Sequence, residues 1–457
     1  MSRLISAFKE CKKDLVIILI GSLIVVGLFF FFGDQLEIII SIILILAYLG
    51  VLLFFIGKYF PSERKFLGPL IVLGLAFRYL FTLAVHFSYF PQGFYPDETA
   101  YFQGGLAIKK IWFGGQFFDI LEYVNIIGLS ENYGYQIFNA LHYLIYESPL
   151  LPKITNIFLG VLLALLVYNL AQKLFTRKIA RISAIVTLFV PNLIYWSGFN
   201  LKEILVAFLV LGIINLAYFP KKKISLKRTF LIFLGIFFLF AVRFYIAIIL
   251  LFFLLFYFFV QASLTQKQRI KIVLVSIVIL TLFYIANPIF KYHTHQIVAQ
   301  GIAPFLQEYQ VSLEKAQVKG YFRGRFEGIT PKNFLIGLAH FFITPSPYRF
   351  QFSLPGVLHI GTLMWYILIP YFLLGTWHLF RHRFKDTSLI VGFIWVLIII
   401  YSFLPHLAGV RHRDQFIPLA ILVSIVGFCV PNRYKKGIIC LTWLIMILGI
   451  TFFEVLY

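Results

Sequence analysis

Charged residues are scarce in this 457-residue chain: Asp, Glu, Lys and Arg make up 13% of it, whereas hydrophobic residues make up 61%. So few charges could not cover the surface of a soluble protein, which excludes a water-soluble enzyme. Cysteine is also rare, and three residues cannot form a disulfide framework for a chain of this length. The 55 phenylalanines and the mean hydropathy of +0.91 exclude a disordered chain and indicate a polytopic membrane protein.

Acidic residues are the scarcer sign of charge, with 18 Asp and Glu against 40 Lys and Arg and a formal net charge of +22. The basic residues lie in short clusters between apolar runs, as loops retained in the cytoplasm require. No basic helix is interleaved with stacking aromatic residues, so a nucleic-acid partner is not expected. The expected surroundings are membrane lipids.

About thirteen apolar runs are long enough, or nearly so, to cross a bilayer as helices. They lie at about residues 14–33, 36–57, 67–88, 152–172, 179–195, 202–219, 229–242, 244–261, 271–290, 356–380, 387–404, 415–430 and 437–455. If the N-terminus is cytoplasmic, every second loop is short and rich in Lys and Arg, as the positive-inside rule requires. The sequence therefore predicts an all-α polytopic protein of the plasma membrane with a cytoplasmic N-terminus.

This topology leaves two long segments, 89–151 and 288–355, on the outer side of the membrane. The outer segments and turns hold most of the carboxylates, and the long segments are rich in Tyr, Phe and Trp. Such a composition is typical of amphipathic helices that lie on a membrane surface. We therefore expect the chemistry of the protein to lie outside the cytoplasm.

Two adjacent acids, Asp97 and Glu98, open a predicted interfacial helix within the sequence Tyr-Pro-Asp-Glu-Thr-Ala-Tyr at 95–101. One interpretation is a helix-start signal, because Pro96 suits a first turn and the helix dipole favours carboxylates there. The other is catalytic: a carboxylate in a semi-buried, like-charged setting becomes more basic and can take a proton from an attacking hydroxyl.

A second candidate is the outer turn at 191–203, which ends in Lys202 and Glu203 at the start of a predicted span. The N-terminus of that helix could bind an anion, such as the phosphate of a lipid, with Lys202 beside it. The alternative is a capped helix with interfacial Lys and Trp anchors.

Several cations lie on the outer side, against the positive-inside tendency, and an arginine there is a candidate phosphate ligand. For Arg243, Arg411, His412 and Arg413 we favour binding of a lipid-linked phosphate. For Arg78, inside the third span, snorkelling or pairing with nearby acids is favoured slightly. The second outer segment, with His340 and Arg349 among its polar residues, is expected to form a lid that contacts the acceptor or the lipid carrier. No His-Glu-x-x-His or similar spacing predicts a zinc site.

The acidic motif, with Gly104, Gly105 and Ala107 after it, resembles the first outer loop of polytopic glycosyltransferases that use polyprenyl-phosphate sugars. These enzymes share the GT-C fold and include the protein O-mannosyltransferases of glycosyltransferase family 39 and the lipid A aminoarabinose transferases. Arg78, the 191–203 turn and Arg-His-Arg-Asp-Gln-Phe-Ile-Pro at 411–418 resemble features of bacterial members. The resemblance covers a GT-C-like catalytic module at about 66–430, between an N-terminal helix pair at 1–65 and a C-terminal helix at 431–457.

The resemblance implies transfer of a sugar from a polyprenyl-phosphate donor to a glycan, lipid or protein acceptor of the cell envelope. Asp97 would be the general base, and Glu98 would orient the acceptor or share the proton. The implied ligands of the donor phosphate are Arg243, Lys202, Arg411, His412 and Arg413, and the implied acceptor or supporting residues are Glu203, Tyr101, Arg78, His340 and Arg349. No cofactor is required; some members are helped by a divalent metal, but nothing in this sequence demands one.

Two departures and two alternatives accompany the resemblance. The acidic loop usually follows the first span in the family, whereas here it follows the third, and an added pair of helices keeps it outside. The chain also ends just after its last predicted span.

A polysaccharide polymerase or ligase, of the O-antigen or capsule type, would share the spans and outer cations but rely on Arg and His rather than a carboxylate base. A lipid-linked sugar transporter or flippase would place broken helices at the middle of the bilayer.

Overall fold

The computed structural model describes residues 35–89, 93–113, 133–218, 226–260, 331–344, 353–403, 410–430 and 435–456, and single positions or pairs between 266 and 281. Within these ranges the chain forms helices and turns and no strand, which confirms the expected all-α class. The chain divides into two compact units. Unit 1 comprises Met1–Leu166 with Ala184–Phe208, and unit 2 comprises Val167–Ser183 with Leu209–Tyr457.

Six helical stretches of the described ranges are long and apolar enough to cross a membrane. They are Gln35–Tyr59, Pro61–Tyr89, Leu150–Leu174, Lys227–Phe259, Gly356–His382 and Phe384–Phe403. A seventh is formed if α9 (Arg177–Phe189) and α10 (Pro191–Ser197), which meet at a bend of 50°, are counted as one broken span. The structure therefore shows a membrane-embedded helical protein, and the finer number of thirteen spans stays a prediction.

Several predicted spans differ from the helices observed. The predicted spans at 202–219 and 415–430 are the shorter apolar helices α11 (Glu203–Ala217) and α20 (Ile417–Cys429). The runs at 229–242 and 244–261 belong to one element, α12 (Leu226–Val260), which leaves helical geometry at the single residue Arg243 (φ −158°, ψ 86°). The predicted break lies at the right residue, but it is one extended residue rather than a turn. The predicted span at 14–33 and most of the one at 271–290 lie outside the described residues.

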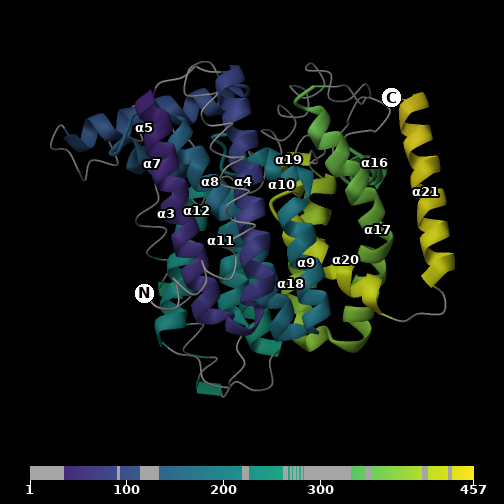
Figure 1. Ribbon diagram of the computed structural model, residues 1–457. Helices are drawn as coiled ribbons and strands as arrows, with labels where there is room; N and C mark the ends of the chain where they lie inside the picture. The colour runs from purple at the N-terminus through teal and green to yellow at the C-terminus, as the bar shows by residue number, and fades with distance from the viewer. Residues whose placement is uncertain are drawn as a thin grey trace, which may run out of the picture. The chain divides into compact units, whose positions relative to one another are not determined.

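Unit 1 is built on α3 (Gln35–Tyr59), α4 (Arg64–Tyr89) and the first part of α8 (Leu150–Leu174). A 3₁₀ turn, Pro61–Glu63, joins α3 to α4, and the two helices lie side by side (Figure 1). Large apolar side chains of α3 are exposed, as expected for a helix that faces lipid; Ile43 is 60% exposed.

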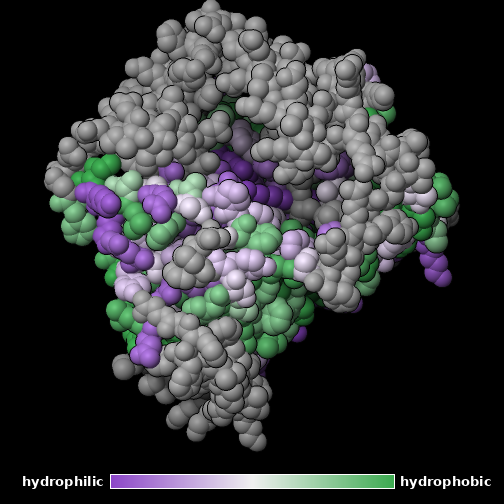
Figure 2. All heavy atoms as spheres, turned by 90° about the horizontal axis from the view of Figure 1, so that it is seen from above, coloured by the Kyte–Doolittle hydropathy of each residue, from purple (hydrophilic) through white to green (hydrophobic). Residues whose placement is uncertain are grey.

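Two short helices, α5 (Pro96–Phe113) and α7 (Tyr133–Tyr143), occupy the first predicted outer segment. Figure 1 shows them at one end of α3 and α4. They pack closely, because a Cβ added at Gly104 would lie 2.7 Å from Gln136, and one added at Gly105 would lie 2.7 Å from the Tyr143 ring. Glycine thus lets α5 approach α7. Hydrophilic side chains are visible on the face of the molecule seen from this end (Figure 2).

Unit 2 contains α12, α17 (Gly356–His382), α18 (Phe384–Phe403), α19 (Val410–Arg413), α20 and α21 (Lys435–Leu456). The helices α17 and α20 pack closely, since a Cβ added at Gly375 would lie 2.0 Å from the carbonyl oxygen of Val423. The described part of the second outer segment is α16 (Pro331–Ile343). It was expected to be a surface lid, but it packs against α18, since a Cβ added at Gly337 would lie 2.0 Å from the Ser402 carbonyl oxygen.

Candidate functional site

The site in unit 1 begins with the cap of α5. Pro96 opens the helix, and Glu98 turns its side chain back so that Oε1 accepts the backbone N–H groups of Phe94 (3.2 Å) and Tyr95 (3.3 Å). A glutamate at the third helical position that reaches back to the residue before the helix is one half of a capping box. Gly93, with φ +70°, makes the preceding turn in a conformation that favours glycine. The helix-start interpretation of the acidic pair is therefore confirmed for Glu98.

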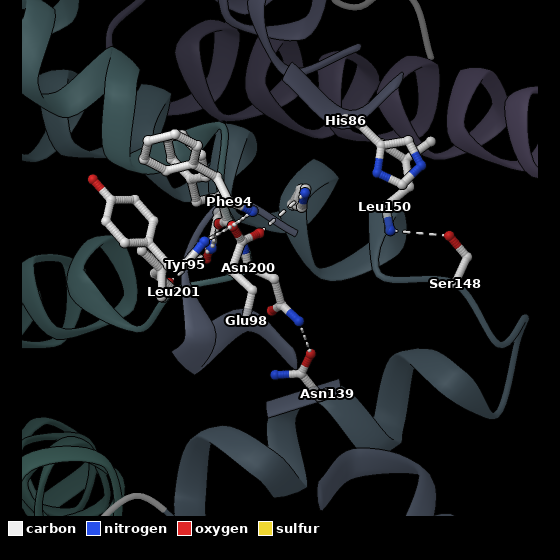
Figure 3. Close-up of polar contacts among 12 residues, drawn as sticks. His86, Phe94, Tyr95, Glu98, Asn139, Ser148, Leu150, Asn200 and Leu201 are labelled. Atoms are coloured by element: carbon white, nitrogen blue, oxygen red, sulfur yellow. Dashed lines mark hydrogen bonds and ion pairs between the residues drawn. The ribbon is translucent and has the colours of Figure 1, made fainter. Parts of the chain in front are cut away.

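The other oxygen of Glu98 contacts two further segments of the chain. Oε2 accepts the backbone N–H of Asn200 (3.1 Å) and lies 3.1 Å from Nζ of Lys153 in an ion pair (Figure 3). The side chains of Lys153 and Glu98 are only 5% and 4% exposed. An ionised carboxylate offers about four lone-pair sites, and Glu98 has four donors. Glu98 is therefore bound on all sides by its own protein.

Asp97 lies beside Glu98 in the first turn of α5 and is half buried. The resemblance implied a catalytic role for both acids, with Asp97 as the general base and Glu98 as the residue that orients the acceptor or shares the proton. The structure separates them, since the Glu98 carboxylate is buried among four donors whereas Asp97 is accessible to solvent in part. Of the two, Asp97 is the carboxylate that a substrate can reach.

A buried network of amides and phenols surrounds the anchor of Glu98. Nδ2 of Asn200 donates to Oδ1 of Asn139 (2.7 Å), and the Tyr135 hydroxyl donates to Oδ1 of Asn200 (3.0 Å). The Tyr143 hydroxyl also donates to Oδ1 of Asn139 (2.8 Å). Burial, and less strongly the charge of Glu203, raise the pKa of Tyr135 well above 10, so its hydroxyl keeps its proton.

Asn156, on α8, ties this network to the turn before α11. Its Nδ2 donates to the Tyr135 hydroxyl (3.1 Å) and to the carbonyl oxygens of Phe199 and Leu201 (3.0 Å each). Sequence reasoning missed Lys153 and Asn156, as well as Asn139, Tyr135 and Asn200. The available signal was a lysine and an asparagine inside the apolar run at 152–172, because polar residues in a span are costly and need partners.

Lys202 and Glu203 are both buried, 5% and 1% exposed, and Glu203 opens α11 as predicted. Tyr101 is buried as well and makes an edge-to-face contact with Tyr135, with ring centroids 4.9 Å apart. The structure therefore brings Glu203 and Tyr101 to the same network as Tyr135. The binding roles predicted for these residues stay predictions.

Arg78 holds the bend between α9 and α10. It is fully buried, and its guanidinium donates to the carbonyl oxygens of Leu193 (2.5 Å) and Leu188 (2.9 Å) and to the Ser197 hydroxyl (2.8 Å). Pro191 opens α10 and has no N–H to give to the preceding turn, and the Arg78 guanidinium donates to one carbonyl group on each side of this proline. These partners of Arg78 are carbonyl and hydroxyl groups rather than the acids expected from the sequence.

A second group of predicted residues meets within unit 2. Nη2 of Arg243, at the break in α12, lies 3.5 Å from Nε2 of His412, on α19. The Arg243 guanidinium also lies over the ring of Tyr245, 5.6 Å from its centroid, and the Tyr245 and Tyr401 hydroxyls are 3.4 Å apart. Arg411 is half buried on α19. The structure thus brings together Arg243 and His412, as expected for a shared anion site.

Arg413 differs from its neighbours because the protein itself uses its guanidinium. It is 1% exposed, donates to the carbonyl oxygens of Phe341 (3.2 Å) and Thr344 (3.1 Å), and lies over the ring of Trp365. Burial lowers its pKa, although the neighbouring Asp414 opposes that change. The Arg413 guanidinium therefore anchors the end of α16, and the phosphate-binding role predicted for it stays a prediction.

The remaining predicted positions add little to either site. His340 is half buried on α16, and Arg349 lies outside the described residues. Within the described ranges, no three His, Cys, Asp or Glu side chains are grouped so that they could hold a metal ion.

A buried pair that the sequence did not suggest connects α3 to α4. Nε2 of His86 lies 3.2 Å from Oε1 of Glu37, and the Ser148 hydroxyl donates to the same oxygen. Ser148 Oγ in turn accepts the backbone N–H of Leu150, at the start of α8 (Figure 3). Glu37 lies on α3, within the N-terminal segment 1–65 that is additional to the resemblance, and these contacts join α3 to α4 and to the start of α8 within unit 1.

No family model, curated protein or solved structure matches the chain.

Proposed function

We propose that the protein is an integral membrane glycosyltransferase that moves a sugar from a polyprenyl-phosphate donor to a cell-envelope acceptor. The observation that carries this proposal is the difference in surroundings between the two acids, Asp97 and Glu98. Glu98 is anchored by four donors, whereas Asp97, beside it in the first turn of α5, is only half buried. A carboxylate fixed in place and open to solvent on one side suits a general base.

In the proposed reaction, Asp97 accepts the proton of the acceptor hydroxyl as the hydroxyl oxygen attacks the anomeric carbon of the donor. The bond from that carbon to the phosphate oxygen breaks, and the lipid phosphate leaves with the bonding electrons. Arg243, His412 and Arg411 are proposed to bind this phosphate, since guanidinium and imidazole groups donate strong hydrogen bonds to it. A positioned base contributes typically about 10²–10⁴-fold to the rate, and charge stabilisation adds to that.

The distribution of basic residues supports a location in the plasma membrane. We place the N-terminus in the cytoplasm, the protein in the plasma membrane of a bacterium, and Asp97 on the outer face. A cysteine introduced beside Asp97 and labelled by a membrane-impermeant maleimide in intact cells would test this side.

The reaction is tested with purified protein in liposomes, a panel of polyprenyl-phosphate sugars and an envelope extract as acceptor. Asp97→Asn should lower the rate of transfer at least 100-fold and leave the thermal stability unchanged. The matched control is Glu147→Gln, which alters a carboxylate that is 59% exposed in an ion pair with Lys109. Full transfer by the Asp97→Asn protein would refute the role of Asp97 as base.

A polysaccharide polymerase or ligase is the second candidate, and the contact between Arg243 and His412 favours it. Such an enzyme binds a lipid pyrophosphate through arginine and histidine, and needs no carboxylate base. It would keep its activity in the Asp97→Asn protein and lose it in the His412→Ala protein, with a lipid-pyrophosphate glycan as donor. A transporter, in contrast, would move the lipid-linked sugar and form no covalent product.

A further inference from the structure

Lys153 occupies a position that is unfavourable for a cation on two counts. It is 4% exposed at the start of α8, a candidate membrane span, and burial of a charge is costly unless the charge is paired. It also lies in the first turn of the helix, where the partial positive charge of the backbone disfavours a second positive charge. The ion pair with Glu98 at 3.1 Å offsets both costs.

Glu98 depends on Lys153 for the same reason. Three of its four donors are neutral backbone N–H groups, from Phe94, Tyr95 and Asn200, and Lys153 is the one formal positive charge within the ion-pair distance in the described part of the chain. Because the two oxygens of Glu98 face different segments, its orientation sets how α5 lies against α8 and against the turn at Asn200. Asp97 belongs to the same helical turn and moves with it.

We propose that Lys153 is a positioning residue for Asp97: through its ion pair it holds Glu98 in the orientation that caps α5, and so fixes where the Asp97 carboxylate lies. The proposal rests on the proposed function for its catalytic meaning, but the position of residue 97 can be measured without any substrate. Lys153 contacts Glu98 and is not proposed to contact a reacting group.

The chain supplies a matched control for Lys153 on α5, the helix that carries Asp97. Lys109, also on α5, pairs with Glu147 at 2.8 Å, but these side chains are 18% and 59% exposed. An exposed ion pair contributes little, because water solvates both partners and screens their attraction. Lys109→Met removes the same kind of charge from unit 1 without leaving a buried carboxylate unpaired.

The first experiment measures the accessibility of position 97. Cys11, Cys429 and Cys440 are replaced by serine, Asp97 by cysteine, and the rate of maleimide labelling is followed in detergent. Lys153→Met should change this rate at least fivefold, whereas Lys153→Arg and Lys109→Met should leave it within twofold. If Lys153→Met misfolds on size-exclusion chromatography, Lys153→Gln is measured in its place. An unchanged rate in a folded variant would overturn the proposal.

The second experiment measures transfer with Asp97 intact. Lys153→Met should lower kcat at least tenfold with the donor KM within threefold, and Lys153→Arg should restore at least half of kcat. The charge reversal Glu98→Lys with Lys153→Glu should not restore it, because a lysine at 98 cannot accept the three N–H groups. Recovery by the charge reversal would show that charge alone matters and would overturn the proposal. If the unaltered protein transfers no sugar, the proposed function fails and the labelling result decides this proposal alone.

Discussion

Arg243 and His412 are 169 residues apart in the chain, yet Nη2 of the arginine lies 3.5 Å from Nε2 of the histidine. Arginine has no acceptor, so in a hydrogen bond at this contact the guanidinium donates and Nε2 of His412 accepts. Both residues lie in unit 2, at the break in α12 and on α19. A guanidinium and an imidazole that meet at a helix break form an arrangement suited to an anionic ligand.

The first prediction concerns this pair. Arg243→Ala and His412→Ala should each raise the donor KM about tenfold, which corresponds to about 1.4 kcal/mol of binding. The double variant should raise it less than 100-fold, since contacting residues that bind one group are not additive. The measurement is initial-rate transfer at varied donor concentration. Arg381→Ala, which removes an exposed cation at the end of α17, should leave the KM unchanged.

A second prediction concerns the bend that Arg78 holds. Arg78→Met should lower the thermal stability in detergent, because the carbonyl groups of Leu188 and Leu193 would lose buried donors, at about 1–3 kcal/mol for each group. Arg78→Lys should recover only part of the loss, since an ammonium cannot span these acceptors as the planar guanidinium does. Lys178→Met, at an exposed position of α9, is the control. Equal melting temperatures for the Arg78→Met and Lys178→Met proteins would contradict this role.

A third prediction tests the contact of α17 with α20. Gly375→Ala should destabilise the protein by about 1–3 kcal/mol, because the added methyl would lie 2.0 Å from the Val423 carbonyl oxygen. Gly50→Ala, in α3, meets nothing within 4 Å and should be neutral or stabilise the protein by about 0.5–1 kcal/mol. Thermal or denaturant unfolding of both proteins in one detergent makes the comparison. Similar stability of the two variants would refute the close approach of the helices.

A fourth prediction concerns pH and His142, on α7. Its Nδ1 lies 2.7 Å from the Phe138 carbonyl oxygen and its Nε2 lies 2.6 Å from the Thr155 hydroxyl, so the ring fits as a neutral group. Burial lowers its pKa below the usual 6.5, although the hydrogen bond to Phe138 opposes this. As pH falls through 6.5, the unfolded chain therefore takes up a proton that the folded chain resists, and stability falls.

The measurement for His142 compares melting temperatures of the unaltered protein and of His142→Gln at pH 8 and pH 5. The unaltered protein should lose more stability on acidification, because the glutamine does not titrate. Parallel losses in the two proteins would show that the imidazole is not kept neutral by the fold.

The sequence predicted those features of the fold that depend on the type of residue at one position or in one local run. The apolar runs give the helices, Pro96 with two acids gives the start of α5, and Arg243 between two apolar runs marks the break in α12. The partners of each charge could not be predicted, because they come from distant segments. Lys153 lies 55 residues beyond Glu98, and the carbonyl groups that bind Arg78 carry no sequence signal at all.

Arg413 is a second case in which the sequence could not predict the partners of a charged residue. Three residues with basic side chains in a row, Arg411, His412 and Arg413, received the same predicted role. Helical geometry turns successive side chains to different sides, so His412 meets Arg243 whereas Arg413 points to the end of α16. Only the three-dimensional arrangement shows that one residue of such a cluster meets Arg243 and another anchors the end of α16.

The contact of Gly375 with Val423 also fixes how α17 and α20 are aligned along their axes. Two helices whose main chains touch through glycine cannot slide by one residue, because the next side chain along would collide with the facing backbone. Only residues 414–416 separate α20 from α19. The contact at Gly375 therefore also limits where His412 can lie along the axis of α17, although the two residues are more than a helical turn apart.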